Sequence, residues 1–82
     1  MFYGIDLAKE SFKAAILADN GSSVQLVSCP LQGDAFERFK AQLTDKDYLA
    51  VEASTNTFWF VDQVRDKVKE CFVLDHFALS NI

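Results

Sequence analysis

Apolar residues along this chain fall into short runs separated by polar turns, a pattern typical of a protein rich in β-strands. Residues 2–7 (FYGIDL) form the first run and residues 11–18 (SFKAAILA) the second. Residues 19–21 (DNG) follow, and because Asn and Gly accept positive φ, they predict a hairpin turn. Residues 23–28 then alternate as a third strand, which we expect to end before Pro30 because proline cannot donate to a ladder.

The apolar residues in the middle of the chain are spaced as in an α-helix. It opens at Gly33 and Asp34, where Asp34 as N-cap and Glu37 three residues later resemble a capping box. Its apolar stripe consists of Phe36, Phe39 and Leu43. A polar connection over residues 44–47 separates this helix from the next apolar run.

The last part of the chain predicts a strand, a helix and a further strand. Residues 48–53 (YLAVEA) are the fourth strand. Residues 54–57 (STNT) offer several N-caps for a second helix over residues 58–68. Residues 70–74 (ECFVL) are the fifth strand.

The order β-β-β-α-β-α-β predicts an α/β fold with a mixed five-stranded sheet in the spatial order 3-2-1-4-5. Both crossovers move the same way across the sheet, so right-handed connections place both helices on one face. The first two strands nevertheless carry apolar residues on both faces, as in sheets that are covered on both sides. We therefore expect either that a segment covering the face without helices is missing from this chain, or that something binds this face.

Two of the apolar strands each carry one carboxylate near their end, Asp6 in the first and Glu52 in the fourth. An acid in an apolar setting costs several kcal/mol unless a charge or hydrogen bond compensates it. If these strands pair, the two acids lie about 5 Å apart in the sheet. A divalent cation would compensate both, which makes Asp6 and Glu52 candidate metal ligands.

Strand parity predicts which face carries the acids. Asp6 shares a face with the small residue Gly4, and Glu52 shares one with Ala50. The opposite face carries larger residues: Tyr3, Ile5, Leu7, Leu49 and Val51. We expect the helices to pack against these larger residues and the acids to lie on the uncovered face. The apolar neighbours expected beside the acids are Phe2, Phe12, Ala14 and Ile16, or the residues of opposite parity on the same strands.

Composition limits the possible functions. Eighty-two residues make one domain, and a formal net charge of −4 argues against autonomous DNA or RNA binding. No apolar run is long enough to span a membrane, and the first residues do not read as a signal peptide. Cys29 and Cys71 lie far apart in apolar segments, which predicts buried thiols and fits a reducing cytoplasm.

Several sequence motifs of the chain resemble those of a known family. Residues 4–11 (GIDLAKES), with the turn over 19–21, resemble the opening of DEDD-type insertion-sequence transposases, relatives of the Piv DNA invertases. Residues 51–54 (VEAS) resemble the second acidic motif, usually Glu-Ala-Thr-Gly, and Phe58 and Trp59 match the aromatic pair that follows it. The resemblance implies an RNase H-like, RuvC-like catalytic domain.

In that family four acids, in the order Asp, Glu, Asp, Asp, hold two Mg²⁺ ions for DNA strand cleavage and transfer. Asp6 matches the first acid and Glu52 the second, while the last two lie on a helix beyond residue 82. The resemblance thus implies the N-terminal fragment of a transposase or recombinase, inactive alone, whose full-length parent uses Mg²⁺ or Mn²⁺. It also implies DNA, and possibly a structured RNA, as partners of that parent.

Several other residues are weaker candidates. Two lysines, Lys9 and Lys13, are either nucleic-acid contacts or solvated charges. The hydroxyl residues Ser54 and Thr55 are either nucleic-acid contacts or helix caps. Asp75 is either a further ligand or a turn residue. The aromatic run of residues 58–60 is expected mostly in the core, although three adjacent aromatic residues cannot all face inward.

Two alternatives stay open. Residues 6–11 and the following hairpin also resemble the phosphate-binding start of actin-like ATPases and sugar kinases, although Ala8 stands where they have glycine. The other alternative, which is compatible with the transposase reading, is a non-catalytic interaction module whose uncovered face is a dimer interface. Under either reading we expect the chain to form a homodimer that buries the uncovered face or exchanges residues 76–82 between its two copies.

Overall fold

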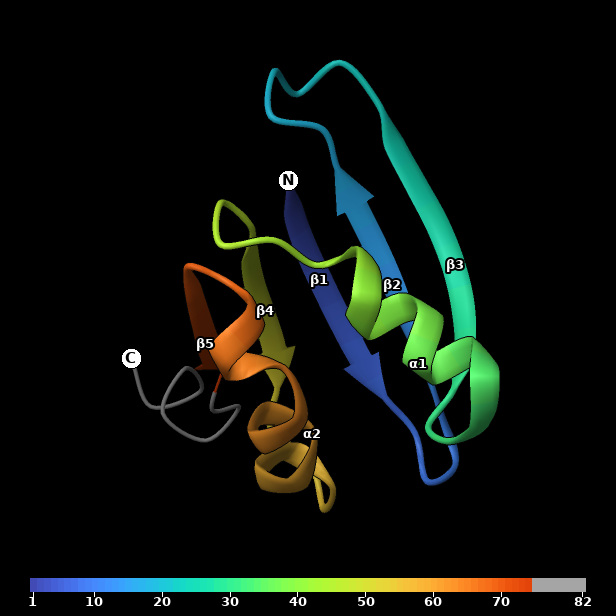
Figure 1. Ribbon diagram of the computed structural model, residues 1–82. Coiled ribbons are helices and arrows are strands. Elements are labelled where there is room, and N and C mark those ends of the chain that lie inside the picture. Colours follow the sequence, from blue (N-terminus) through green and yellow to red (C-terminus); the bar gives the residue numbers. More distant parts are fainter. Residues whose placement is uncertain (75–82) are drawn as a thin grey trace.

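The computed structural model describes residues 1–74, which form a five-stranded mixed sheet and two helices (Figure 1). The strands are β1 (Phe2–Leu7), β2 (Ser11–Leu17), β3 (Val24–Pro30), β4 (Tyr48–Glu52) and β5 (Glu70–Leu74). The helices are α1 (Gly33–Gln42) and α2 (Thr57–Val64), and a 3₁₀ turn over Arg65–Lys67 continues α2. The predicted order of elements is confirmed.

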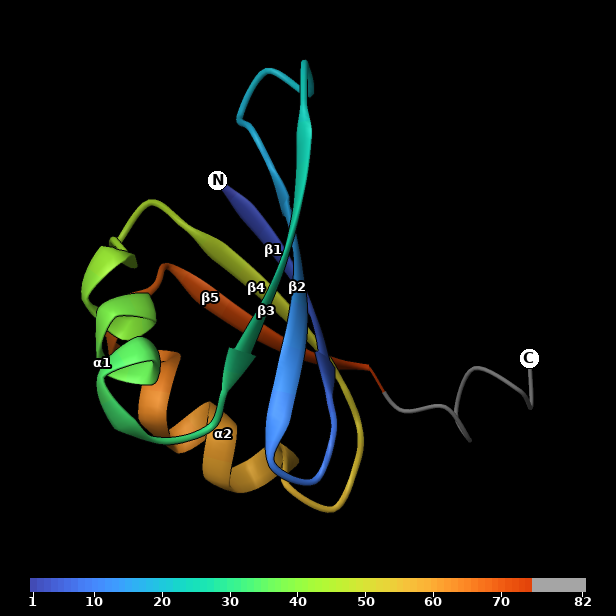
Figure 2. The same ribbon diagram turned by 90° about the vertical axis from the view of Figure 1, so that its right-hand side faces the viewer.

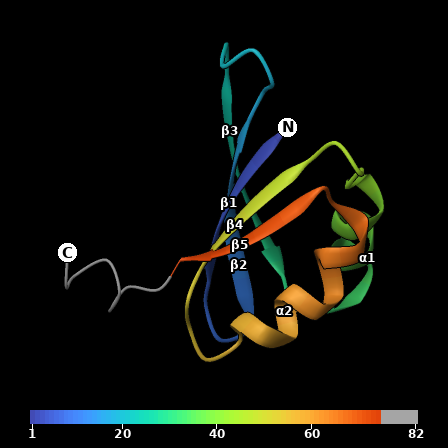
Figure 3. The same cartoon turned by 90° about the vertical axis from the view of Figure 1, so that its left-hand side faces the viewer.

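The sheet has the predicted order β3-β2-β1-β4-β5. β2 is antiparallel to β1 and β3, whereas β4 is parallel to β1 and β5. Figures 2 and 3 view the sheet nearly edge-on from opposite edges and show α1 and α2 both packed on one face. We call this the covered face. We call the opposite one, which has no helix among residues 1–74, the bare face.

The covered face holds the core. The larger strand residues predicted to meet the helices are all buried: Tyr3, Ile5, Leu7, Leu49 and Val51. Phe12 lies at the centre, with its ring centroid 4.8 Å from that of Phe39 and 5.3 Å from that of Phe60. Such edge-on aromatic contacts add to the free energy of burial.

Of the two sets of β2 residues expected beside the acids, the one named first is wrong. The register pairs Phe12 with Leu7 and Ala14 with Ile5, so Phe12, Ala14 and Ile16 lie on the covered face. The residues of β2 on the bare face are Lys13, Ala15 and Leu17. Parity within one strand cannot fix the register against its neighbour, which caused the error.

The bare face is largely apolar. The exposed large hydrophobic residues on it are Phe2, Leu17, Val24, Leu26, Phe72 and Leu74. A contiguous exposed patch of this kind is unusual on a monomeric protein. The expectation that the helices leave one apolar face uncovered is confirmed for residues 1–74.

Two local predictions differ from the structure. β3 continues through Pro30 rather than ending before it. At the start of α1, Asp34 is not the N-cap: the cap position is Gln32, and Gly33 turns the chain with φ of +82°. Asp34 lies inside the first turn, where its negative charge still interacts favourably with the helix dipole. Glu37 forms an ion pair with Lys40 at 2.8 Å.

Candidate functional site

The two predicted acids come together at the carboxyl ends of two neighbouring strands. β1 and β4 run parallel, and the last pair in their register is Ile5 with Val51. The next residue on each strand is an acid, Asp6 on β1 and Glu52 on β4. Because side chains alternate, both acids belong to the bare face, as predicted.

Both acids are exposed to solvent. The premise that each sits in an apolar setting and needs compensation is therefore wrong for this chain. Asp6 also has a cation directly opposite, since the β1–β2 register pairs it with Lys13. Opposite charges across a ladder stabilise a sheet by about 0.2–1 kcal/mol. The register thus gives Asp6 a neighbour of opposite charge without a metal ion, although no ion pair joins the two side chains among the described residues.

Asp6 and Lys13 line a hollow of about 360 Å³ on the bare face. Small residues form its floor, among them Gly4 and Ala15, and Leu26 and Ser28 form its side towards β3. Within residues 1–74 no group of three or more His, Cys, Asp or Glu side chains is placed to hold a metal ion. The described part of the chain thus supplies a pair of carboxylates, not a complete cage.

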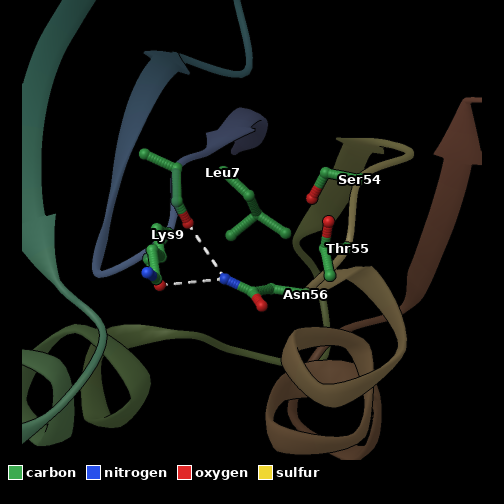
Figure 4. Close-up of a pocket in the computed structure, with 6 residues that line it drawn as sticks. Leu7, Lys9, Ser54, Thr55 and Asn56 are labelled. Carbon is green, nitrogen blue, oxygen red and sulfur yellow. Dashed lines mark hydrogen bonds between the residues drawn. The ribbon is translucent and has the colours of Figure 1, made fainter.

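A second hollow, of about 400 Å³, lies beyond the ends of the same two strands (Figure 4). It is lined by Leu7, Ala8, Lys9, Ser54, Thr55 and Asn56. Three of the four predicted nucleic-acid contacts, Lys9, Ser54 and Thr55, come together here. The fourth, Lys13, lies in the other hollow beside Asp6.

Asn56 holds the two sides of this second hollow together. Its side-chain nitrogen donates to the carbonyl oxygens of Ala8 and Lys9, each at 3.0 Å (Figure 4). Asn56 occupies the N-cap position of α2, yet its side chain makes no cap hydrogen bond. The sequence indicated only a cap, because nothing local shows that its partners lie 47 and 48 positions earlier.

Thr57 fixes the path of the chain after Glu52. Its side chain is buried, and its hydroxyl oxygen accepts the Ser54 N–H at 2.6 Å. The hydroxyl donates to the Glu52 carbonyl oxygen at 3.3 Å. This turn sets where β4 stops and α2 starts, so it positions the main chain that carries Glu52.

A third acid, Asp47, lies at the opposite end of β4 and is buried. Its carboxylate accepts the Thr44 N–H and the Met1 ammonium, each at 2.8 Å. Burial alone would raise the pKa of Asp47, but these hydrogen bonds and the ammonium charge outweigh it and lower the pKa. Asp47 is a structural acid that the sequence assigned only to a polar connection.

The remaining candidates have simpler roles. Cys29 is buried and Cys71 half-buried, both as free thiols, and burial raises the pKa of each. Of the aromatic run, only Phe60 is buried, whereas Phe58 is 80% exposed and Trp59 46% exposed. The expectation that this run is mostly core is therefore wrong. Asp75, the other candidate ligand, lies outside the described residues.

No helix within residues 1–74 is long and apolar enough to cross a membrane. Comparison of the chain with models of known families, with curated proteins and with solved structures finds no match.

Proposed function

We propose that this chain contributes the first two carboxylates, Asp6 and Glu52, of a Mg²⁺- or Mn²⁺-dependent centre for DNA strand cleavage and transfer. The fold would be RNase H-like, as in DEDD-type transposases. One observation carries the proposal: Asp6 and Glu52 follow directly on the last pair of the parallel β1–β4 register and share the bare face. Oxygen ligands on neighbouring strands suit a hard divalent cation.

Two carboxylates are too few for a two-ion site. Such sites hold ions roughly 3.5–4 Å apart and clamp the attacking and leaving oxygens of a phosphodiester. Further carboxylates would have to reach Asp6 and Glu52 from a segment that packs on the bare face. The exposed apolar residues there, such as Phe2 and Phe72, would give that segment a surface to pack against.

The second hollow supports a contact to a nucleic-acid backbone. Lys9 supplies a cation, and the hydroxyl groups of Ser54 and Thr55 can donate to phosphate oxygens. These contacts are few, and the net charge is −4, so little counterion release is available. In this proposal the DNA, and any structured RNA, is held mainly by other parts of the parent protein.

Manganese is the most direct probe, because the bound ion broadens the NMR signals of nearby residues. We expect Mn²⁺ to broaden amide signals at the carboxyl ends of β1 and β4, with a dissociation constant on the order of 10⁻³ M. Asp6→Asn and Glu52→Gln should each abolish the broadening. Lys13→Gln should strengthen binding, because it removes the positive charge opposite Asp6 in the β1–β2 register.

The matched control is Asp45→Asn, an exposed acid at the opposite end of β4, which should leave the broadening unchanged. Broadening that survives both Asp6→Asn and Glu52→Gln would refute the assignment of the site. The chain alone should not cleave DNA with Mg²⁺ or Mn²⁺. Robust cleavage that Asp6→Ala removes would show that two acids suffice and that the remaining ligands are not needed.

A further inference from the structure

β3 is an edge strand, and its hydrogen bonds show which main-chain groups face outward. The Leu31 N–H donates to the Glu10 carbonyl at 3.0 Å, and the Ala18 N–H donates to the Ser23 carbonyl at 3.2 Å. These bonds lie just beyond the two ends of the β2–β3 register. In an antiparallel ladder the N–H and C=O of a residue point to the same side, and successive residues alternate.

The alternation assigns each residue of β3. Gln25, Val27 and Cys29 have the same parity as Leu31 and direct their main-chain groups to β2. The N–H and C=O groups of Val24, Leu26 and Ser28 point away from the sheet, along its outer edge. Pro30 shares this outward parity, which explains why β3 can continue through it: the N–H that proline lacks would have bonded nothing in β2.

This edge lacks the usual protection against pairing. Natural edge strands are short, bulged, interrupted by proline or charged. β3 has seven residues, none of them charged, and its proline stands at the last position. Figure 1 shows β3 along the outside of the fold, with no other described strand on the side away from β2. The other edge strand, β5, is shorter and begins with Glu70.

Two of the outward residues, Val24 and Leu26, also have apolar side chains that are open to solvent. Leu26 is 79% exposed and Val24 62%, the largest exposures among the large hydrophobic residues of the strands. An extended backbone with apolar side chains matches both features, because it supplies hydrogen-bond partners at the strand spacing and covers Leu26. Only another β-strand provides this combination.

We propose that β3 pairs antiparallel with β3 of a second copy, so that two sheets join edge to edge around a two-fold axis beside Leu26. In this register Leu26 lies opposite the partner's Leu26, and Val24 lies opposite the partner's Ser28. The strand is self-complementary, since no charge meets another across the axis although each chain carries −4. The interface is small, so the dimer is weak, on the order of micromolar or weaker.

Pairing of the two bare faces is the competing dimer, and the acids argue against it. It would carry Asp6 and Glu52 of both copies into one interface, where burial of like charges is costly. Edge pairing leaves both acids in solvent and leaves the bare face open. It rests on β3 rather than on the acid pair of β1 and β4, although Leu26 and Ser28 also line the hollow beside Asp6.

Amide hydrogen exchange measured at several protein concentrations tests the pairing without any substitution. Between about 10 μM and 1 mM chain, protection of the Leu26 and Ser28 amides should rise. The Gln25 and Val27 amides already bond β2, so their protection should not change. The proposal would be overturned if exchange at Leu26 and Ser28 did not depend on protein concentration and sedimentation equilibrium showed a monomer up to about 1 mM. Binding of an added peptide to this edge would not rescue it.

Three variants separate edge pairing from face pairing in the same sedimentation experiment. Leu26→Pro removes one outward N–H and no bond to β2, so it should abolish the dimer with the fold retained by circular dichroism. Leu26→Ala keeps that N–H and should weaken the dimer by less. Phe72→Lys places a charge on the bare face and should leave the dimer intact.

The reverse result, a dimer that survives Leu26→Pro and is lost in Phe72→Lys, would assign the interface to the bare face and refute edge pairing. If Leu26→Pro unfolds the chain, the concentration dependence of exchange in the unmodified protein decides the question.

Discussion

Alternate residues of β1 meet two different environments. Tyr3, Ile5 and Leu7 are at most 9% exposed and lie beneath the helices, whereas Phe2 and Asp6 on the same strand face solvent. One face of the sheet therefore provides the burial that stabilises the fold. The other face contributes little burial, which leaves it free to carry exposed carboxylates and apolar residues that can contact something else.

The acids of the molecule divide in the same way. Asp47, at the start of β4, is buried and accepts two hydrogen bonds. Glu52, at the end of the same strand, and Asp6 beside it are exposed. The hydrogen bonds of a buried acid stabilise the fold, while exposed acids at strand ends are accessible to a ligand. The two groups should thus respond differently to substitution.

The largest contrast is expected between one phenylalanine on each face. Phe12→Ala removes the ring at the centre of the core, 1% exposed, and should lower the free energy of unfolding by about 3–5 kcal/mol. Phe72→Ala on the bare face, where the ring is 44% exposed, should lower it by about 1 kcal/mol or less. Urea unfolding followed by circular dichroism measures both.

The comparison of faces fails if the two variants lose similar stability. A large loss in Phe72→Ala would mean that something covers the bare face in solution. Repeating the measurement at several protein concentrations would then show whether association is responsible, because only an associated state makes the unfolding midpoint depend on concentration.

The next effect concerns Asp47. Asp47→Asn replaces a carboxylate that accepts the Thr44 N–H and the Met1 ammonium, and should cost about 1–3 kcal/mol at about pH 7. Asp45→Asn, two residues earlier and exposed, should change stability by about 0.5 kcal/mol or less. Equal effects of the two substitutions would contradict the distinction between buried and exposed acids.

The pH dependence gives the sign of the Asp47 contribution. The pKa of Asp47 is lowered in the folded chain, so its stabilisation is present above the unfolded value of about 3.9. It is lost as the pH falls through the lower folded value. The stability difference between the unmodified chain and Asp47→Asn should therefore be constant near neutral pH and shrink below about pH 4.

The sheet order and the two faces could be predicted because their signals are local. The turn over residues 19–21 and the alternation of β1 and β4 each involve residues close in sequence. The right-handedness of the crossover connections then predicted that both helices lie on the same face of the sheet. The register between β1 and β2 could not be derived in this way, and that is why Phe12 was assigned to the wrong face.

The site was predicted in part for the same reason. Asp6 and Glu52 stand out as acids in apolar strands, and parity placed them on one face. The cross-strand position of Lys13 and the bridge from Asn56 to the β1–β2 turn depend on distant segments. Residue type alone indicates a solvated cation and a helix cap, so neither role has a sequence signal.

Substitution of Asp6 is expected to have the smallest effect on stability and a clear effect on Mn²⁺ binding. Its side chain is exposed on the bare face, so Asp6→Asn leaves no cavity and no buried charge. It loses only the attraction to Lys13 opposite, so the free energy of unfolding should change by about 0.5 kcal/mol or less. A double-mutant cycle with Lys13→Gln should give a coupling energy of similar size. The same Asp6→Asn variant should lose Mn²⁺ binding, which separates a ligand from a structural residue. If Asp6→Asn instead lowered the free energy of unfolding by more than about 2 kcal/mol, Asp6 would be needed to stabilise the fold. The bare face would then contribute to stability as well as being available for binding.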